Sequence, residues 1–230
     1  DEILFEGATY ADLLAKQGPV AVANGTDIST GSRLSFYQND FDLLCSDLTK
    51  VRLSRAAATS SAVPVVLSAV TFNNYGGTCG YEYPAWVADV ARTDGRVRPS
   101  ARALQRYREM RDFQNSKDRP YIHLVDGGVA DNIGMRSVLE ALEALGASHA
   151  FRGEVGFGAL ERIVLIVANS RSAPRNDWDR VEDPPGLVDQ LLKSSGVPID
   201  RYSFETIESM KEREEIYSWK REILSLRGRR

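Results

Sequence analysis

Residues 121–134 read YIHLVDGGVADNIG and place one carboxylate where an apolar run ends. The run 121–125 is predicted to be a strand. Asp126 follows it directly, at the carboxyl end, where sheets flanked by helices place their ligands. Gly127 and Gly128 add no side chains beside it and permit positive φ. The position suits a functional carboxylate, although Asp-Gly is also common in turns, where Asp126 would only accept turn hydrogen bonds.

Strands and helices alternate outward from this segment, which predicts an α/β fold with helices layered on a sheet. Upstream, strands are expected at 20–23, 34–37 and 65–72, and helices at 8–16, 52–62 and 99–113. The first two strands are expected to form a hairpin, with Asn24 and Gly25 as the turn that stops the first strand.

Downstream of Asp126, a helix is expected from about 133 to 145, capped at its start by Asp131 or Asn132. Residues 163–168, IVLIVA, are apolar throughout, which predicts a strand at the centre of a sheet covered on both faces. Residues 187–193 are expected to be helical. A long amphipathic helix is expected from about 203 to 227.

The bulk composition excludes few functions. The chain has 230 residues, 43% hydrophobic and 27% charged, and a net charge of -3, so no basic excess points to nucleic acid. The two histidines, His123 and His149, offer little material for a metal site. The acids at 177, 179, 182 and 183 suit a solvated loop better than a calcium site. We therefore expect neither a metal nor a cofactor.

Three blocks of the sequence, taken in order, resemble the patatin-like phospholipases. Residues 24–31, NGTDISTG, are similar to the family's N-[AG]-T-D-x-x-x-G turn. Residues 56–64, AAATSSAVP, are similar to its A-x-x-A-S-x-A-[IV]-P segment, with Thr59 in place of the second alanine. Residues 123–134 are similar to its D-G-[GA] block. The matches run from about residue 20 to about residue 170.

The resemblance implies a three-layer α/β/α sandwich with a mostly parallel central sheet, incomplete in this chain. It implies a lipid acyl hydrolase that uses a Ser–Asp dyad, in which Asp126 takes the proton of the serine. Gly127 and Gly128 would support the oxyanion site or the turn. The alternative is a non-catalytic scaffold of the same family that binds lipid or a protein partner.

The nucleophile elbow G-x-S-x-G is missing from the 230 residues. The nearest match, GASHA at 146–150, ends in alanine and follows a predicted helix, so Ser148 is interpreted as a loop residue. Residues 76–80, GGTCG, mimic an oxyanion loop but lack its basic residue. We therefore expect the serine upstream of residue 1 and interpret residues 1–230 as the C-terminal part of one catalytic domain, inactive in isolation.

The remaining expectations concern partners and location. The resemblance implies a lipid or acyl-ester substrate, the missing N-terminal segment of the same protein as partner, and peripheral membrane contact. Cys45 and Cys79 can form one disulfide or remain two buried thiols. Both fall in segments similar to exported bacterial members of the family, which favours an extracytoplasmic or cell-envelope location over a cytoplasmic one.

The roles of several arginine and histidine side chains can be interpreted from the sequence. Arg33, Arg52 and Arg55 could reach a phospholipid headgroup or be solvated surface residues. His123 lies three residues before Asp126, so strand alternation places it on the opposite face of the sheet, outside any dyad. His149 is interpreted as a loop residue.

Overall fold

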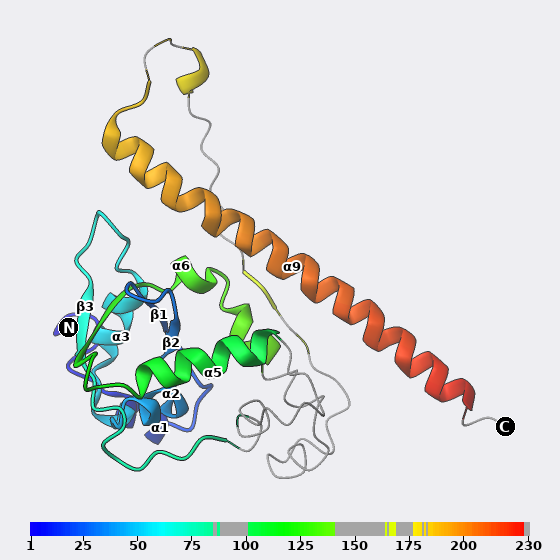
Figure 1. Ribbon diagram of the computed structural model, residues 1–230, viewed down its shortest axis with the longest axis horizontal. Helices are drawn as coiled ribbons and strands as arrows, with labels where there is room; N and C mark the ends of the chain where they lie inside the picture. The colour runs from blue at the N-terminus through cyan, green and yellow to red at the C-terminus, as the bar shows by residue number, and fades with distance from the viewer. Residues whose placement is uncertain are drawn as a thin grey trace. The chain divides into compact units, whose positions relative to one another are not determined.

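The structure is a computed structural model that describes residues 1–84, 87, 101–140, 164, 166–168, 177–180, 182 and 184–227. The chain divides into two compact units, Asp1–Ala130 and Asp131–Arg230. The first unit contains the sheet, and the second contains the long helix α9 (Figure 1).

The sheet of the first unit has four strands in the order β2-β1-β4-β3. They are β1 (Asn24–Asp27), β2 (Arg33–Ser35), β3 (Val70–Asn73) and β4 (Tyr121–Asp126). β1 pairs with β2 and with β4, β3 pairs with β4, and every pairing is antiparallel. The predicted mostly parallel central sheet of a three-layer sandwich is therefore wrong. The fold is mixed α/β with an all-antiparallel sheet.

The prediction of a parallel sheet fails because of how β4 is paired. Both edges of β4 are occupied by antiparallel neighbours, β1 and β3, so it has no free edge for a parallel strand. The predicted central strand at 163–168 is also wrong where the structure describes it. Residues 164 and 166–168 belong to no strand, and Ile166 is 92% exposed. An apolar run indicates that a segment is hydrophobic. It does not indicate the direction of a strand or the strand with which it pairs.

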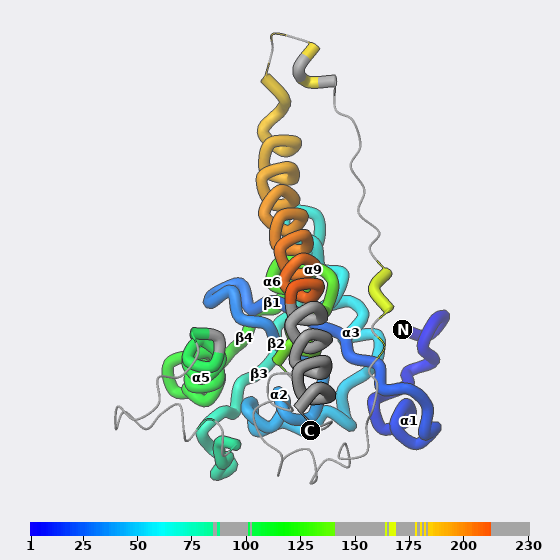
Figure 2. The backbone as a smooth tube through the Cα atoms, turned by 90° about the vertical axis from the view of Figure 1, so that its right-hand side faces the viewer, coloured from blue at the N-terminus to red at the C-terminus, as the bar shows by residue number. Residues whose placement is uncertain are grey.

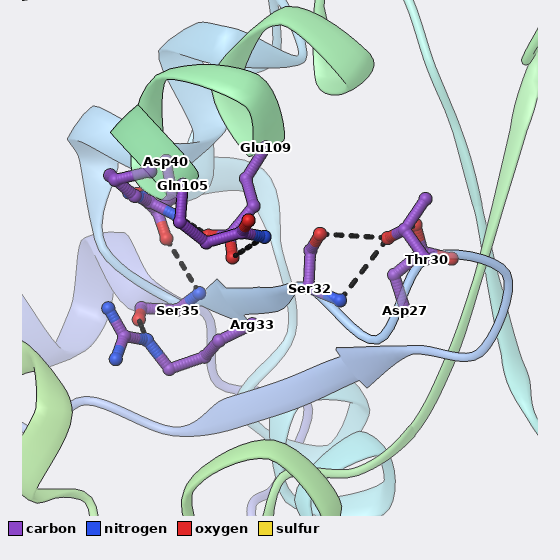
Figure 3. Close-up of polar contacts among 9 residues, drawn as sticks. Asp27, Thr30, Ser32, Arg33, Ser35, Asp40, Gln105 and Glu109 are labelled. Atoms are coloured by element: carbon purple, nitrogen blue, oxygen red, sulfur yellow. Dashed lines mark hydrogen bonds and ion pairs between the residues drawn. The ribbon is translucent and has the colours of Figure 1, made fainter. Parts of the chain in front are cut away.

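The predicted hairpin is present, but its first strand begins later than expected. β1 contains Asn24 and Gly25, which we had assigned to the turn. The turn follows Asp27 instead, because the Asp27 carboxylate accepts hydrogen bonds from Ser29 N (3.1 Å) and Thr30 Oγ1 (2.8 Å). Figure 3 shows Ser32 completing the turn through Thr30. A carboxylate that bonds its own following backbone is a strong turn signal.

The described residues of the first unit form six helices, of which the sequence predicted α1, α3 and α5. They are α1 (Tyr10–Ala15), α2 (Gln38–Leu43), the 3₁₀ helix η1 (Leu48–Lys50), α3 (Leu53–Ser60), α5 (Ala101–Phe113) and the short α6 (Gly128–Asp131). The helices expected at 8–16 and 52–62 are confirmed with shorter ends, and the helix expected at 99–113 is confirmed over 101–113, where the structure describes it. α3 packs against β1, β3 and β4 and lies beside the sheet in Figure 2.

An aromatic cluster forms the centre of the core. The ring of Phe36 packs against the rings of Tyr10, Phe41 and Phe72 at centroid distances of 5.5–6.3 Å. The β4 residues Ile122 and Leu124, also buried, belong to the same cluster. Asp40 joins the strands to the helices. It accepts a hydrogen bond from Ser35 N at 2.8 Å (Figure 3). It also forms an ion pair with Arg106 of α5.

Cys45 and Cys79 form a disulfide, with their Cα atoms 5.6 Å apart. The bond ties the segment after α2 to the glycine-rich loop at 76–80. In that loop Gly76 lies so close to α5 that a Cβ atom would meet the Phe113 carbonyl oxygen at 2.1 Å. This loop, which we compared with an oxyanion loop, therefore serves as a packed and cross-linked connection.

In the second unit, α9 (Leu187–Arg227) is one helix that includes Pro198. The sequence predicted two helices, at 187–193 and about 203–227, because glycine and proline interrupt the pattern between them. The carboxylate of Asp131 accepts hydrogen bonds from Met135 N (3.1 Å) and Arg136 N (2.9 Å). Asp131 thus caps the following helix, as expected, although the helical residues begin at 135. A 3₁₀ helix, η3, spans Asp177–Arg180.

Loss of the disulfide should lower the stability of the fold. It closes a loop with a sequence separation of 34. The chain-entropy relation gives about 4 kcal/mol for a loop of that length. We expect the double variant Cys45→Ser/Cys79→Ser to unfold in urea with a free energy lower by about that amount. A reducing agent should destabilise the wild-type protein and leave the variant unchanged. A wild-type midpoint insensitive to reductant would contradict the assignment.

Candidate functional site

The three sequence blocks meet at the end of β4. The backbone N–H of Asp126 donates to the carbonyl oxygen of Ala62, from the block at 56–64, at 2.9 Å. The hydroxyl of Thr26, from the block at 24–31, donates to the Asp126 carbonyl oxygen at 2.9 Å. Gly25 is the register partner of Asp126 across the β1–β4 ladder. The backbone of Asp126 is therefore held by both of the other blocks.

Strand direction decides which segments surround this carboxylate. Because the pairing is antiparallel, the carboxyl end of β4 lies beside the amino ends of β1 and β3. Our expectation that the carboxyl end of this strand is where the sheet places ligands applies to parallel sheets. The neighbours of Asp126 are instead Gly25 and the chain that leads into Val70.

One oxygen of the Asp126 carboxylate is engaged and the other is not. Oδ1 accepts a hydrogen bond from Gly128 N at 2.7 Å, which closes a turn at the start of α6. Within the described part of the chain, Oδ2 has no hydrogen-bond partner, and the residue is partly exposed. The group can therefore hold its turn and still accept a proton from a hydroxyl placed at Oδ2.

Gly127 is required for space rather than for an unusual backbone angle. A Cβ atom there would lie 2.4 Å from the Asn24 carbonyl oxygen. Neither Gly127 nor Gly128 has positive φ, so the conformational reason we gave for them does not apply. The N–H of Gly128 is bonded to Asp126 itself, so it is not available as an oxyanion donor. Nearby, the side-chain oxygen of Asn24 is buried and has no hydrogen-bond partner among the residues that the structure describes.

Thr26 is a site residue that the sequence interpretation missed. Its side chain is 2% exposed, and its hydroxyl also accepts a hydrogen bond from Ala130 N at 3.1 Å. One hydroxyl therefore connects β1 to both sides of the Asp126 turn. The signal was present, because this threonine is a fixed position of the N-[AG]-T-D pattern, but no role had been attached to it.

Asp27, from the same pattern, is a structural carboxylate. It is fully buried and forms an ion pair with Arg119, which precedes β4. Asn74 Nδ2 in turn donates to the Arg119 carbonyl oxygen at 2.9 Å. Removing one partner of a buried ion pair leaves an uncompensated charge, which makes such pairs costly to break. This pair fixes the hairpin turn relative to the amino end of β4.

Both histidines were interpreted as non-catalytic. His123 is exposed and lies within 2.9 Å of Thr71 Oγ1 through its Nδ1 atom. It is an odd number of residues from Asp126 on the same strand, so it projects from the opposite face. Ser148 and His149 lie outside the described residues.

The arginines named for headgroup contact differ in environment. Arg33 is buried in β2, and its guanidinium donates to Ser35 Oγ (Figure 3). Arg52 forms an ion pair with Asp1 at 3.0 Å. Arg55 is exposed and lies 4.6 Å over the ring of Phe72.

The described ranges contain no cluster of histidine, cysteine, aspartate or glutamate that could hold a metal ion. Among the same residues, no helix has the length and apolar character needed to span a bilayer.

Comparisons with protein-family models, with curated proteins and with solved structures find no match to this chain. The resemblance to patatin-like phospholipases therefore rests on the three blocks.

The contact between two of these blocks can be tested directly. A Cβ atom on Gly25 would lie 2.7 Å from Thr59 Cγ2 and 3.3 Å from Leu124 Cβ. We expect Gly25→Ala to lower the free energy of unfolding by about 1–3 kcal/mol, as overpacking does. Adding Thr59→Ala to the Gly25→Ala variant removes the methyl group that the new Cβ atom would meet. The free energy of unfolding of the double variant should then be at least about 0.5 kcal/mol higher than the sum of the two single effects predicts.

Gly127→Ala is the matched comparison. Its obstacle is the backbone oxygen of Asn24, so no side-chain substitution should rescue it. Strictly additive effects of Gly25→Ala and Thr59→Ala in urea unfolding would contradict the predicted contact.

Proposed function

We propose that this chain carries the aspartate of a lipid acyl hydrolase that works through a Ser–Asp dyad, with Asp126 as the base. The observation that supports the proposal is the meeting of the three blocks at Asp126. Segments far apart in the sequence converge there and hold the backbone, while Oδ2 remains without a partner among the described residues. A structural turn alone requires only the local bond from Gly128.

The proposed chemistry assigns each proton. A serine hydroxyl attacks the ester carbonyl carbon, and its proton passes to Asp126 Oδ2. When the tetrahedral intermediate collapses, the ester C–O bond breaks and the protonated Asp126 returns the proton to the leaving alcohol. In the second half, Asp126 takes a proton from water, whose oxygen attacks the acyl carbonyl carbon. The bond between that carbon and the serine oxygen then breaks, the fatty acid leaves, and Asp126 returns the proton to the serine oxygen. No histidine takes part, which agrees with the exposed position of His123 on the other face.

The serine in this proposal lies outside the 230 residues, because they contain no G-x-S-x-G elbow. Gly128 N–H is already bonded to Asp126, so it does not serve as an oxyanion donor in this proposal. The disulfide between Cys45 and Cys79 supports an oxidising location outside the cytoplasm.

A second candidate is a non-catalytic scaffold that binds lipid or a protein partner. The bond from Gly128 N to Asp126 Oδ1 favours it, because that bond gives the carboxylate a sufficient structural role. The two candidates predict different activities for a variant in which the Asp126 carboxylate is replaced by an amide of the same shape.

We expect Asp126→Asn, in a protein that includes the serine, to lose activity while staying folded. The amide oxygen can still accept the Gly128 N–H bond, so the free energy of unfolding should change by about 1 kcal/mol or less. The amide cannot take the serine proton, so turnover of an acyl ester should fall about a hundredfold or more. Ester hydrolysis and thermal unfolding of the same preparation measure both quantities.

Asp126→Ala is the matched control because it removes the base and the turn acceptor together. It should lose activity to the same degree and also lose about 1–3 kcal/mol of stability, the cost of an unmade buried hydrogen bond. If Asp126→Asn keeps near-full activity, Asp126 is not the base. If its losses of activity and stability run in parallel, the carboxylate is structural.

The isolated 230-residue chain should not turn over a short-chain chromogenic ester. Turnover that survives Asp126→Ala would place the chemistry elsewhere in the chain. Turnover abolished by Ser148→Ala would restore Ser148 as a nucleophile.

A further inference from the structure

The connection between α3 and β3 exposes an apolar surface beside the candidate site. Residues 63–67 read VPVVL, with no charged side chain. Val63, Val65, Val66 and Leu67 are 42%, 62%, 62% and 54% exposed. Figure 1 shows this cyan segment extending beyond the ends of the strands of the first unit. We refer to residues 63–67 as the apolar loop.

The apolar loop lies at the same end of the sheet as Asp126. Its first residue follows Ala62, whose carbonyl oxygen accepts the Asp126 N–H bond at 2.9 Å. Its chain then enters β3 at Val70, which is the register partner of Leu124. Because β3 and β4 are antiparallel, the residues before Val70 leave the sheet on the side where β4 ends.

The backbone of the apolar loop satisfies several of its own hydrogen bonds. Val66 N and Leu67 N both donate to the Val63 carbonyl oxygen, at 3.2 and 2.9 Å, and Val63 N donates to Ser61 O at 2.8 Å. The exposed surface is therefore presented by side chains, with these N–H groups already paired. Pairing these three N–H groups lowers the cost of placing the loop in an apolar environment, because unpaired backbone groups are costly there.

Arg55 of α3 places a cation beside β3, the strand into which the apolar loop leads. Arg55 donates to the carbonyl oxygen of Thr71, at the start of β3, and lies over the ring of Phe72. Among the described residues no carboxylate forms an ion pair with it. An apolar tip with a cation near its base matches the order of groups in a phospholipid surface, with acyl chains inside and phosphates outside.

We propose that the apolar loop docks the protein on a phospholipid surface, with Val66 and Leu67 among the acyl chains and Arg55 at the phosphates. This inference rests on the proposed function, since it specifies that the substrate is met in an aggregated lipid phase. Docking at this end of the sheet brings the ester bonds of the outer lipids to the side of the molecule that carries Asp126.

The test is sedimentation of a protein that includes the serine with phosphatidylcholine vesicles, with and without phosphatidylserine. Leu67→Asp and Val66→Asp should each lower the partition coefficient about tenfold or more, because each replaces a side chain that becomes buried on docking. Leu14→Asp is the matched control, since Leu14 of α1 is 53% exposed, close to the 54% of Leu67. It should bind within about twofold of the wild-type protein.

Arg55→Gln should weaken binding about fivefold on vesicles with phosphatidylserine and much less on phosphatidylcholine alone. Asp126→Asn should bind like the wild-type protein, because docking involves no chemistry. The Asp126→Asn variant separates the two proposals. If it binds vesicles normally and also remains active, the Ser–Asp dyad is rejected and the docking proposal stands.

Three results would overturn the docking proposal. The first is wild-type binding by Leu67→Asp, and the second is an equal loss in Leu14→Asp. The third is a wild-type chain that elutes as a dimer and becomes monomeric in Leu67→Asp without binding vesicles, which would assign the apolar loop to a second copy of the chain. Far-ultraviolet circular dichroism of each variant establishes that it is folded.

Discussion

β4 is hydrogen-bonded along both of its edges, to β1 on one side and to β3 on the other, and in both cases the partner runs in the opposite direction. This pairing fixes what can surround its last residue, Asp126. The amino ends of β1 and β3 are brought to that position, and with them Gly25 and the segment that follows α3. The core helices then cover the face that carries Leu124.

Small residues make this convergence sterically feasible. Gly25 leaves room for Thr59 of α3, and Gly127 leaves room for the backbone of Asn24. The hydroxyl of Thr26 bonds to both sides of the turn between them. Each block therefore contacts both of the other two. The same geometry serves a scaffold and a catalyst, and the unengaged Oδ2 atom of Asp126 is the feature that favours the catalyst.

The sequence predicted the parts of the fold that depend on local patterns. Local composition located α3, α5 and β4, and Asp131 was one of the two residues, with Asn132, proposed as a helix cap. Strand direction was not predictable, because an apolar strand has the same composition whether its neighbour is parallel or antiparallel. The turn after Asp27 was missed because Asn24-Gly25 is a stronger turn signal in isolation than a carboxylate that bonds its own following backbone.

The candidate site was predictable where a pattern carried it and not where pairing across the chain did. Asp126 came from the motif, and Thr26 was within a motif without a role. The ion pair between Asp27 and Arg119 joins residues 92 positions apart. The sequence around either residue does not predict that it pairs with the other. The apolar loop was visible only as a strand-like run, since its exposure depends on the turn that its own backbone closes.

The central claim is that Asp126 activates a serine that lies outside these 230 residues. Labelling of the longer protein with a fluorophosphonate, followed by peptide mapping, tests it most directly, because the reagent bonds covalently to an activated serine. The account predicts one labelled serine, in a G-x-S-x-G segment outside residues 1–230, and a labelling rate that collapses in Asp126→Asn. A labelled serine within residues 1–230, or labelling unaffected by Asp126→Asn, would contradict it.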